Sequence, residues 1–110
     1  MTELFDTTQV WVADDTGRRA SAKVATVGRV ATIAFTVPCG SVSGGVRRTL
    51  VRRVFALPAV RTCRAVRVSV PLGDAELLDQ LRHVLPRAQT RAAGATCLID
   101  AHLTLDGNAP

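Results

Sequence analysis

The sequence contains no tyrosine, and its other aromatic residues are three phenylalanines and one tryptophan among 110 residues. Domains that bind single-stranded nucleic acid by stacking, such as RRM and OB-fold domains, present several aromatic side chains to the bases. Phe35 and Phe55 stand in apolar segments where we expect core positions. The composition therefore argues against base stacking as a mode of nucleic-acid recognition.

Cysteine is scarce and widely spaced. Cys39, Cys63 and Cys97 are an odd number, and the chain has neither a Cys-x-x-Cys nor a His-x-x-x-His pair. Disulfide frameworks use even numbers of cysteines, and zinc sites use closely spaced Cys and His ligands. We therefore expect small, buried, free thiols in a reducing compartment, with no metal site and no cofactor.

Long apolar runs are also missing. No segment approaches the roughly 20 apolar residues that cross a bilayer, and no basic stretch precedes an apolar one at the N-terminus. The composition is 47% apolar and 21% charged, which is typical of a chain that buries a core. We predict a single cytoplasmic domain over residues 1–110 without membrane contact, in which 106–110 form a flexible tail.

Acidic residues are absent between Asp15 and Asp74, although the chain as a whole carries a net charge of only +5. Eleven of the 14 Lys and Arg residues lie in that interval: Arg18, Arg19, Lys23, Arg29, Arg47, Arg48, Arg52, Arg53, Arg61, Arg64 and Arg67. Such a basic segment attracts polyanions, so we expect an anionic partner, above all a nucleic-acid backbone, or an acidic protein. The alternative is a compositional bias, since 13 of the 14 are arginine, as in proteins from GC-rich genomes.

The first third of the chain has the pattern of three strands. Segments 8–14, 18–27 and 30–37 are rich in β-forming residues, and the second alternates apolar and polar side chains. Gly17 can close a hairpin between the first two, and Pro38 ends the third because it has no N–H to donate. These segments predict a three-stranded meander.

Two amphipathic helices follow. Over 46–57 apolar residues recur at helical spacing opposite several arginines, and Pro58 stops the pattern. Asp74 is a suitable N-cap for a second helix, whose leucine stripe runs to Pro86.

The remaining segments 64–70 and 95–105 alternate as strands, and we read 87–91 as a polar linker. The order β-β-β-α-β-α-β predicts an α+β two-layer sandwich. It has a five-stranded, mainly antiparallel or mixed sheet, with both helices on one face and the other face partly polar or paired with a second subunit.

The glycine-rich segment 39–45 before the basic helix is the local feature with the clearest chemical content. Backbone N–H groups at a helix N-terminus can hold phosphate or carboxylate, although the segment lacks the Walker A and dinucleotide-binding spacings. The alternative is a simple flexible connection. The anion or nucleic-acid contacts that we predict are Ser43, Gly44, Gly45, Arg47, Arg48, Arg52, Arg53, Arg64 and Arg67.

Two other functions remain open at this level. A self-associating subunit, such as a homodimer, could pair through an edge strand or the open sheet face, which would explain why Leu98 points to a polar face. A small enzyme could use phosphate or thiol chemistry near Cys39–Arg48, because thiols near helix N-termini are activated. We expect binding rather than catalysis, since the spacing of a phosphatase-like Cys-x5-Arg motif is not met.

Overall fold

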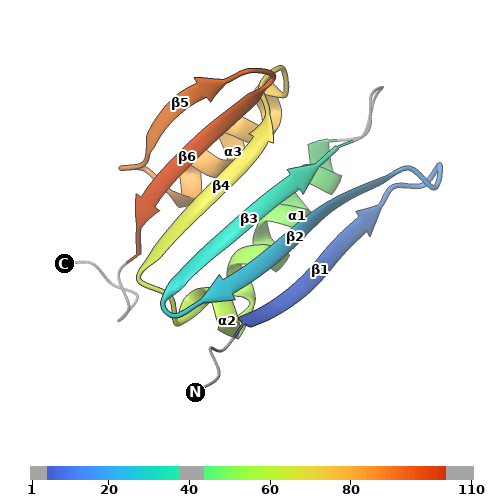
Figure 1. Cartoon of the computed structure of the whole chain (residues 1–110). Helices are drawn as coiled ribbons and strands as arrows, with labels where there is room; N and C mark the ends of the chain where they lie inside the picture. Colours follow the sequence, from blue (N-terminus) through green and yellow to red (C-terminus); the bar gives the residue numbers. More distant parts are fainter. Residues whose placement is uncertain (1–4, 38–43, 104–110) are drawn as a thin grey trace.

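The computed structural model describes residues 5–37 and 44–103, which form a six-stranded mixed sheet and three helices. The strands are β1 (Phe5–Ala13), β2 (Arg19–Val27), β3 (Val30–Thr36), β4 (Ala65–Pro71), β5 (Gln89–Ala93) and β6 (Thr96–His102). The helices are α1 (Gly44–Ala56), α2 (Pro58–Arg61) and α3 (Ala75–Val84). The sheet order is β1-β2-β3-β4-β6-β5, and all three helices lie behind the sheet in Figure 1. The predicted α+β class, with helices on one face, is confirmed.

The meander β1-β2-β3 forms as its turn residues predict. Asp14 Oδ1 accepts hydrogen bonds from the backbone N–H groups of Thr16 (2.9 Å) and Arg18 (3.0 Å), and Gly17 adopts a φ of 86°. The Thr16 hydroxyl also donates to Asp14 at 2.6 Å, and this bond is the main reason that the pKa of the Asp14 carboxyl lies below its ordinary value. Gly28, with a φ of 63°, turns β2 into β3.

β3 and β4 are joined differently, because they run parallel. Their register pairs Val30 with Ala65 and continues to Ala34 with Ser69. A parallel pair needs a crossover, which α1 and α2 supply on the covered face of the sheet (Figure 1). The other pairings in the described sheet are antiparallel.

The prediction of five strands and two helices was wrong in two places. Segment 87–91, which we read as a linker, contains most of β5, whose residues are all exposed and so show no alternation of burial. Pairing with β6 through a turn at Gly94 holds this strand in place. Pro58 does end α1, but it also starts the one-turn helix α2, since proline suits the first position of a helix. The predicted tail 106–110 lies outside the described residues.

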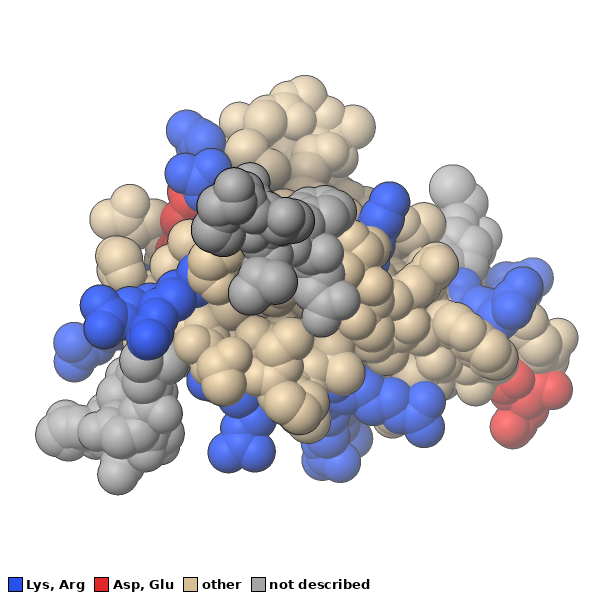
Figure 2. Space-filling model, turned by 60° about the horizontal axis from the view of Figure 1, so that its bottom comes forward, with Lys and Arg blue, Asp and Glu red and all other residues tan. Residues whose placement is uncertain are grey.

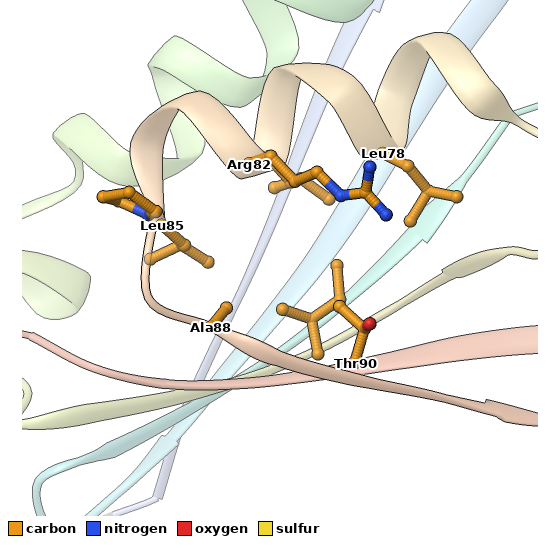
Figure 3. Close-up of a pocket in the computed structure, with 8 residues that line it drawn as sticks. Leu78, Arg82, Leu85, Ala88 and Thr90 are labelled. Atoms are coloured by element: carbon orange, nitrogen blue, oxygen red, sulfur yellow. The ribbon is translucent and has the colours of Figure 1, made fainter.

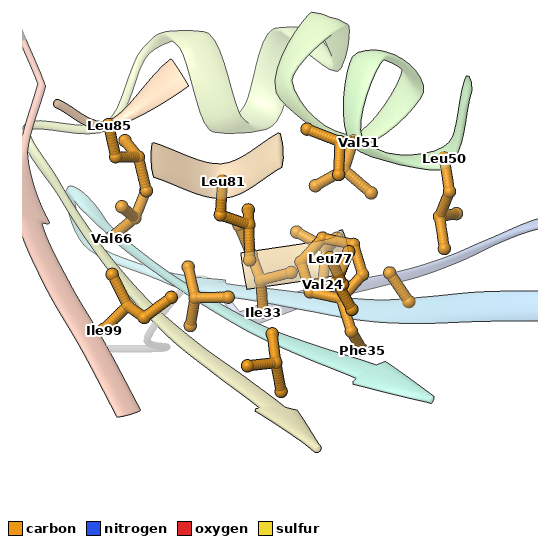
Figure 4. Close-up of a cluster of buried hydrophobic side chains, with 14 of the residues drawn as sticks. Val24, Ile33, Phe35, Leu50, Val51, Val66, Leu77, Leu81, Leu85 and Ile99 are labelled. Atoms are coloured by element: carbon orange, nitrogen blue, oxygen red, sulfur yellow. The ribbon is translucent and has the colours of Figure 1, made fainter. Parts of the chain in front are cut away.

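The core lies between the helices and one face of the sheet. Alternate residues of the central strands are buried there, including Ala20, Ala22 and Val24 on β2. In Figure 4 the leucines of α3 and the residues Leu50 and Val51 of α1 point down toward the sheet, whose buried face carries Ile33, Val66 and Ile99. The predicted apolar stripes therefore do form the core.

No helix covers the opposite face of the described sheet, which we call the open face. The register puts Trp11, Lys23, Thr32, Arg67 and Asp100 on it, and all five side chains are exposed. Leu98 also lies on this face and is half-buried. Among the helices of residues 44–103, none has the length and apolar character needed to cross a membrane.

Leu81 offers a direct test of the core. It is fully buried on α3, whereas Val84 on the same helix is 43% exposed. We expect Leu81→Ala to lower the free energy of unfolding by about 2–5 kcal/mol, because it leaves a cavity between α3 and the sheet. The control Val84→Ala should change it by no more than about 0.5 kcal/mol. Urea denaturation measures both, and equal losses would contradict this packing.

Candidate functional site

The parallel strands β3 and β4 separate at their carboxyl ends. Their pairing stops at Ala34 and Ser69, although β3 runs on to Thr36 and β4 to Pro71. The two arrows diverge in Figure 1, and a hollow of about 300 Å³ lies at this point. We call it the β3–β4 cleft; it is lined by Phe35, Thr36, Val37, Ser69, Val70, Pro71, Ala95 and Thr96.

The described residues that line the cleft are uncharged. Its polar side chains are the hydroxyls of Thr36, Ser69 and Thr96, and the remaining lining residues are apolar. The backbone N–H of Leu72 donates to the carbonyl of Ala95 at 2.9 Å, which ties the end of β4 to the β5–β6 turn. Such a hollow can hold an elongated, uncharged group through hydroxyls and main-chain atoms. It offers no acid or base among the residues that line it.

The first turn of α1 contacts the start of α3, which follows β4 in the chain. Arg47 is 8% exposed, and its Nε lies 2.9 Å from Oδ1 and 3.0 Å from Oδ2 of Asp74. Asp74 is three residues beyond Pro71 of the cleft, and its Oδ1 also accepts the backbone N–H of Leu77 at 3.0 Å. The predicted N-cap of α3 is therefore confirmed, and the same carboxylate fixes α1 against α3.

Glu76 extends this contact. Its Oε1 lies 3.5 Å from Nη1 of Arg47, at the solvent-exposed side of the pair. We call Arg47, Asp74 and Glu76 the α1–α3 clamp. Because two carboxylates engage Arg47, its charge is balanced within the fold, and it serves first to hold the two helices together.

The glycines predicted for an anion cradle form the start of α1. Gly44 is its first residue, and Gly45 is exposed in its first turn. Ser43, one of the predicted anion contacts, and Cys39, whose thiol the enzyme alternative would use, lie outside the described residues.

Three of the predicted arginines share the outer surface of α1. Arg48, Arg52 and Arg53 are exposed, and none lies within salt-bridge distance of an acidic side chain in the described part of the chain. We call this surface the basic face of α1. In the view of Figure 2, Lys and Arg side chains form several separate groups with few acidic groups between them.

The other two predicted arginines lie elsewhere. The backbone N–H of Arg64 donates to the carbonyl of Arg29 at 2.7 Å, at the end of the sheet where β4 begins. Arg67 is on the open face, where its Nε is 3.7 Å from Oδ1 of Asp100. It lines a hollow of about 540 Å³ together with Arg87 and His102. The predicted contacts therefore lie in three places, which are α1, the end of the sheet where β4 begins, and the open face.

A smaller hollow of about 180 Å³ lies between α3 and β5. Figure 3 shows Leu78, Leu85 and Ala88 around it, with the guanidinium of Arg82 above Thr90. Its walls are mostly aliphatic and continue the core.

The described cysteines are buried and free. The Sγ of Cys63 donates to the carbonyl of Ala59 at 3.2 Å, and burial raises the pKa of this thiol. A raised pKa keeps the thiol protonated at neutral pH, which makes it a poor nucleophile. Within residues 5–37 and 44–103, no three His, Cys, Asp or Glu side chains gather as a metal site would need.

Comparison with known proteins gives a likeness of fold. No family model and no curated protein matches the sequence. A solved structure described as "putative acetyltransferase from Sphaerobacter thermophilus DSM 20745" matches with a TM-score of 0.60 and 11% identity. The match covers 90% of this chain and 66% of that protein, so this chain spans just under two thirds of its length. At this identity the likeness shows a shared fold.

The α1–α3 clamp can be tested by removing one carboxylate. Asp74→Ala removes the carboxylate that accepts the Nε–H of buried Arg47 and also removes the N-cap of α3, so we expect a loss of about 3–5 kcal/mol in the free energy of unfolding. The control Glu76→Ala removes a carboxylate that is 65% exposed and should cost less than about 1 kcal/mol. Chemical denaturation of both variants measures these losses. A small loss of unfolding free energy for Asp74→Ala would show that the clamp does not hold the two helices together.

Proposed function

We propose that this chain binds an acyl carrier of the coenzyme A type, with the uncharged arm in the β3–β4 cleft and the phosphates near the start of α1. The observation that carries the proposal is the separation of two parallel strands at their carboxyl ends. Open sheets with parallel strands take their ligands outside those ends. The shared fold with a protein described as an acetyltransferase supports an acyl carrier as the ligand class.

The chemistry of the cleft suits the arm of such a carrier. The arm is a chain of methylene and amide groups, and coenzyme A is one of the common carriers of acyl groups. Its amides can form hydrogen bonds with the hydroxyls of Thr36 and Ser69, while its methylenes pack on Val37 and Val70. No charge in the lining opposes the burial of this arm.

The phosphate end fits the first turns of α1. A helix N-terminus carries a partial positive charge and free N–H groups, which favour phosphate. Arg48 follows on the exposed side of the helix, and the α1–α3 clamp holds this turn next to the segment that follows the cleft. Arg47, already bound by Asp74, would act by positioning this turn.

The proposal concerns binding rather than catalysis. The described residues that line the cleft include no acid or base, and this chain spans 66% of the protein that shares its fold. A reaction in the cleft would need an acid or base from outside these residues.

Calorimetric titration with coenzyme A, acetyl-coenzyme A and pantetheine tests this proposal. Ser69→Trp fills the cleft and should lower the affinity for all three ligands at least tenfold. The control Thr32→Trp, on the same face of the sheet but away from the cleft lining, should leave these affinities unchanged. Arg48→Ala should weaken coenzyme A by about threefold to tenfold, as for a lost ion pair, and leave pantetheine unchanged, because pantetheine carries no phosphate. No binding at millimolar ligand, or equal binding by Ser69→Trp, would refute the site.

A second candidate is the binding of a polyanion, such as a nucleic-acid backbone, on the basic face of α1. It is favoured by one observation: Arg48, Arg52 and Arg53 are exposed together and are not paired with a described acid. With one exposed tryptophan and no tyrosine in the chain, recognition would rest on phosphate contacts.

Fluorescence anisotropy with duplex and single-stranded DNA and RNA at several salt concentrations tests this candidate. Log affinity should fall linearly with log salt, and replacing all three arginines by glutamate should abolish binding. A matched control reverses Arg67, Arg82 and Arg91, which gives the same net charge at other places and should retain most of the affinity. Equal losses for both triple variants would show that only the total charge matters.

A further inference from the structure

The two edges of the sheet differ in how they are protected. β5 has five residues, all exposed, and carries Arg91 in its middle. β1 has nine residues paired with β2 in unbroken register, from Phe5 with Val27 to Ala13 with Arg19. Natural proteins protect edge strands by shortness, charge, proline or a bulge, because an open edge pairs with other chains. β5 has two of these protections, whereas β1 has no proline or bulge and carries its one charged residue, Asp6, near its start.

We propose that two copies of this chain pair through β1 in antiparallel orientation, so that their sheets become one. This inference does not rest on the proposed ligand, since β1 is separated from the β3–β4 cleft by β2 and β3.

The side chains of β1 support a protein partner. Trp11 is 52% exposed on the open face, at the outer edge of the sheet. Arg19 lies with its guanidinium carbon 5.1 Å from the centre of the Trp11 ring, which leaves the rest of the indole to solvent. On the other face, Val10 and Val12 are only partly buried against the core. An exposed tryptophan is typical of the residues that dominate the energy of an interface.

The sequence of β1 fits a second copy of itself. Residues 7–13 carry no charge, so the central parts of two identical strands can approach without repulsion, and the acidic residues Asp6 and Asp14 meet only at the two ends of the paired segment. An antiparallel pairing centred on Val10 places Val10 opposite its equivalent and Thr8 opposite Val12. Such β-branched cross-strand pairs stabilise sheets. The same pairing through β5 would bring Arg91 near its own copy, which is unfavourable.

The net charge predicts how the affinity of the dimer depends on salt. Each copy carries +5, so the two repel at long range and salt should screen that repulsion. The dimer should therefore become tighter as salt rises, whereas attraction to a polyanion becomes weaker.

Sedimentation equilibrium of the full chain at micromolar concentrations, in low and high salt, tests the pairing. We expect a dimer that tightens with salt. Replacing Thr8 and Gln9 by lysine, both exposed on β1, should weaken it at least tenfold and leave the melting temperature of the monomer nearly unchanged. The same change at Gln89 and Thr90 on β5 adds equal charge at the other edge and should have no effect on the dimer.

Trp11 gives a second readout that does not depend on mass. Dimer formation should shift its fluorescence to shorter wavelength and protect it from iodide quenching, and the β1 lysine variant should remove both effects. A chain that stays monomeric at both salt concentrations overturns the proposal, as does a dimer that is sensitive to the β5 variant only. A monomer that still binds coenzyme A would overturn this proposal alone.

Discussion

The parallel pairing of β3 with β4 is the interaction on which the rest of the structure depends. It joins the meander β1-β2-β3 to the group β4-β6-β5, and no other strand pairing connects these two parts of the described sheet. Because parallel strands need a crossover, the chain must pass through α1 and α2 on one face. That passage brings α1 onto α3, where Arg47 meets Asp74. The same pairing ends at Ser69, which creates the cleft that we propose as the ligand site.

Much of this fold could be predicted from periodicity. The alternation of Ala20, Ala22 and Val24 marked one buried face of β2, and the leucine stripe marked the buried side of α3. Asp74 could be recognised as an N-cap because the role depends on local chemistry alone. β5 could not be recognised, because both faces of this edge strand are exposed and its sequence therefore shows no alternation of apolar and polar residues. The strand exists because its pairing with β6 supplies the hydrogen bonds.

The candidate site was harder to predict, for physical reasons. Arg47 and Asp74 are 27 residues apart, so their contact depends on how α1 and α3 cross and leaves no local signal. The arginines looked like one basic segment, but the fold sends Arg48, Arg64 and Arg67 to different places. The lining of the cleft consists of uncharged residues that sequence analysis treats as ordinary strand ends. Its chemistry arises from the separation of two strands, which only the fold determines.

A nuclear magnetic resonance titration of the labelled chain with coenzyme A tests whether the separated ends of β3 and β4 form the ligand site. We expect the largest amide shifts at Thr36, Val37, Ser69 and Val70, with smaller shifts in the first turn of α1. Shifts confined to the outer surface of α1 would instead favour contact with phosphate by charge alone. Shifts confined to β5 and β6, or none at saturating ligand, would contradict the account.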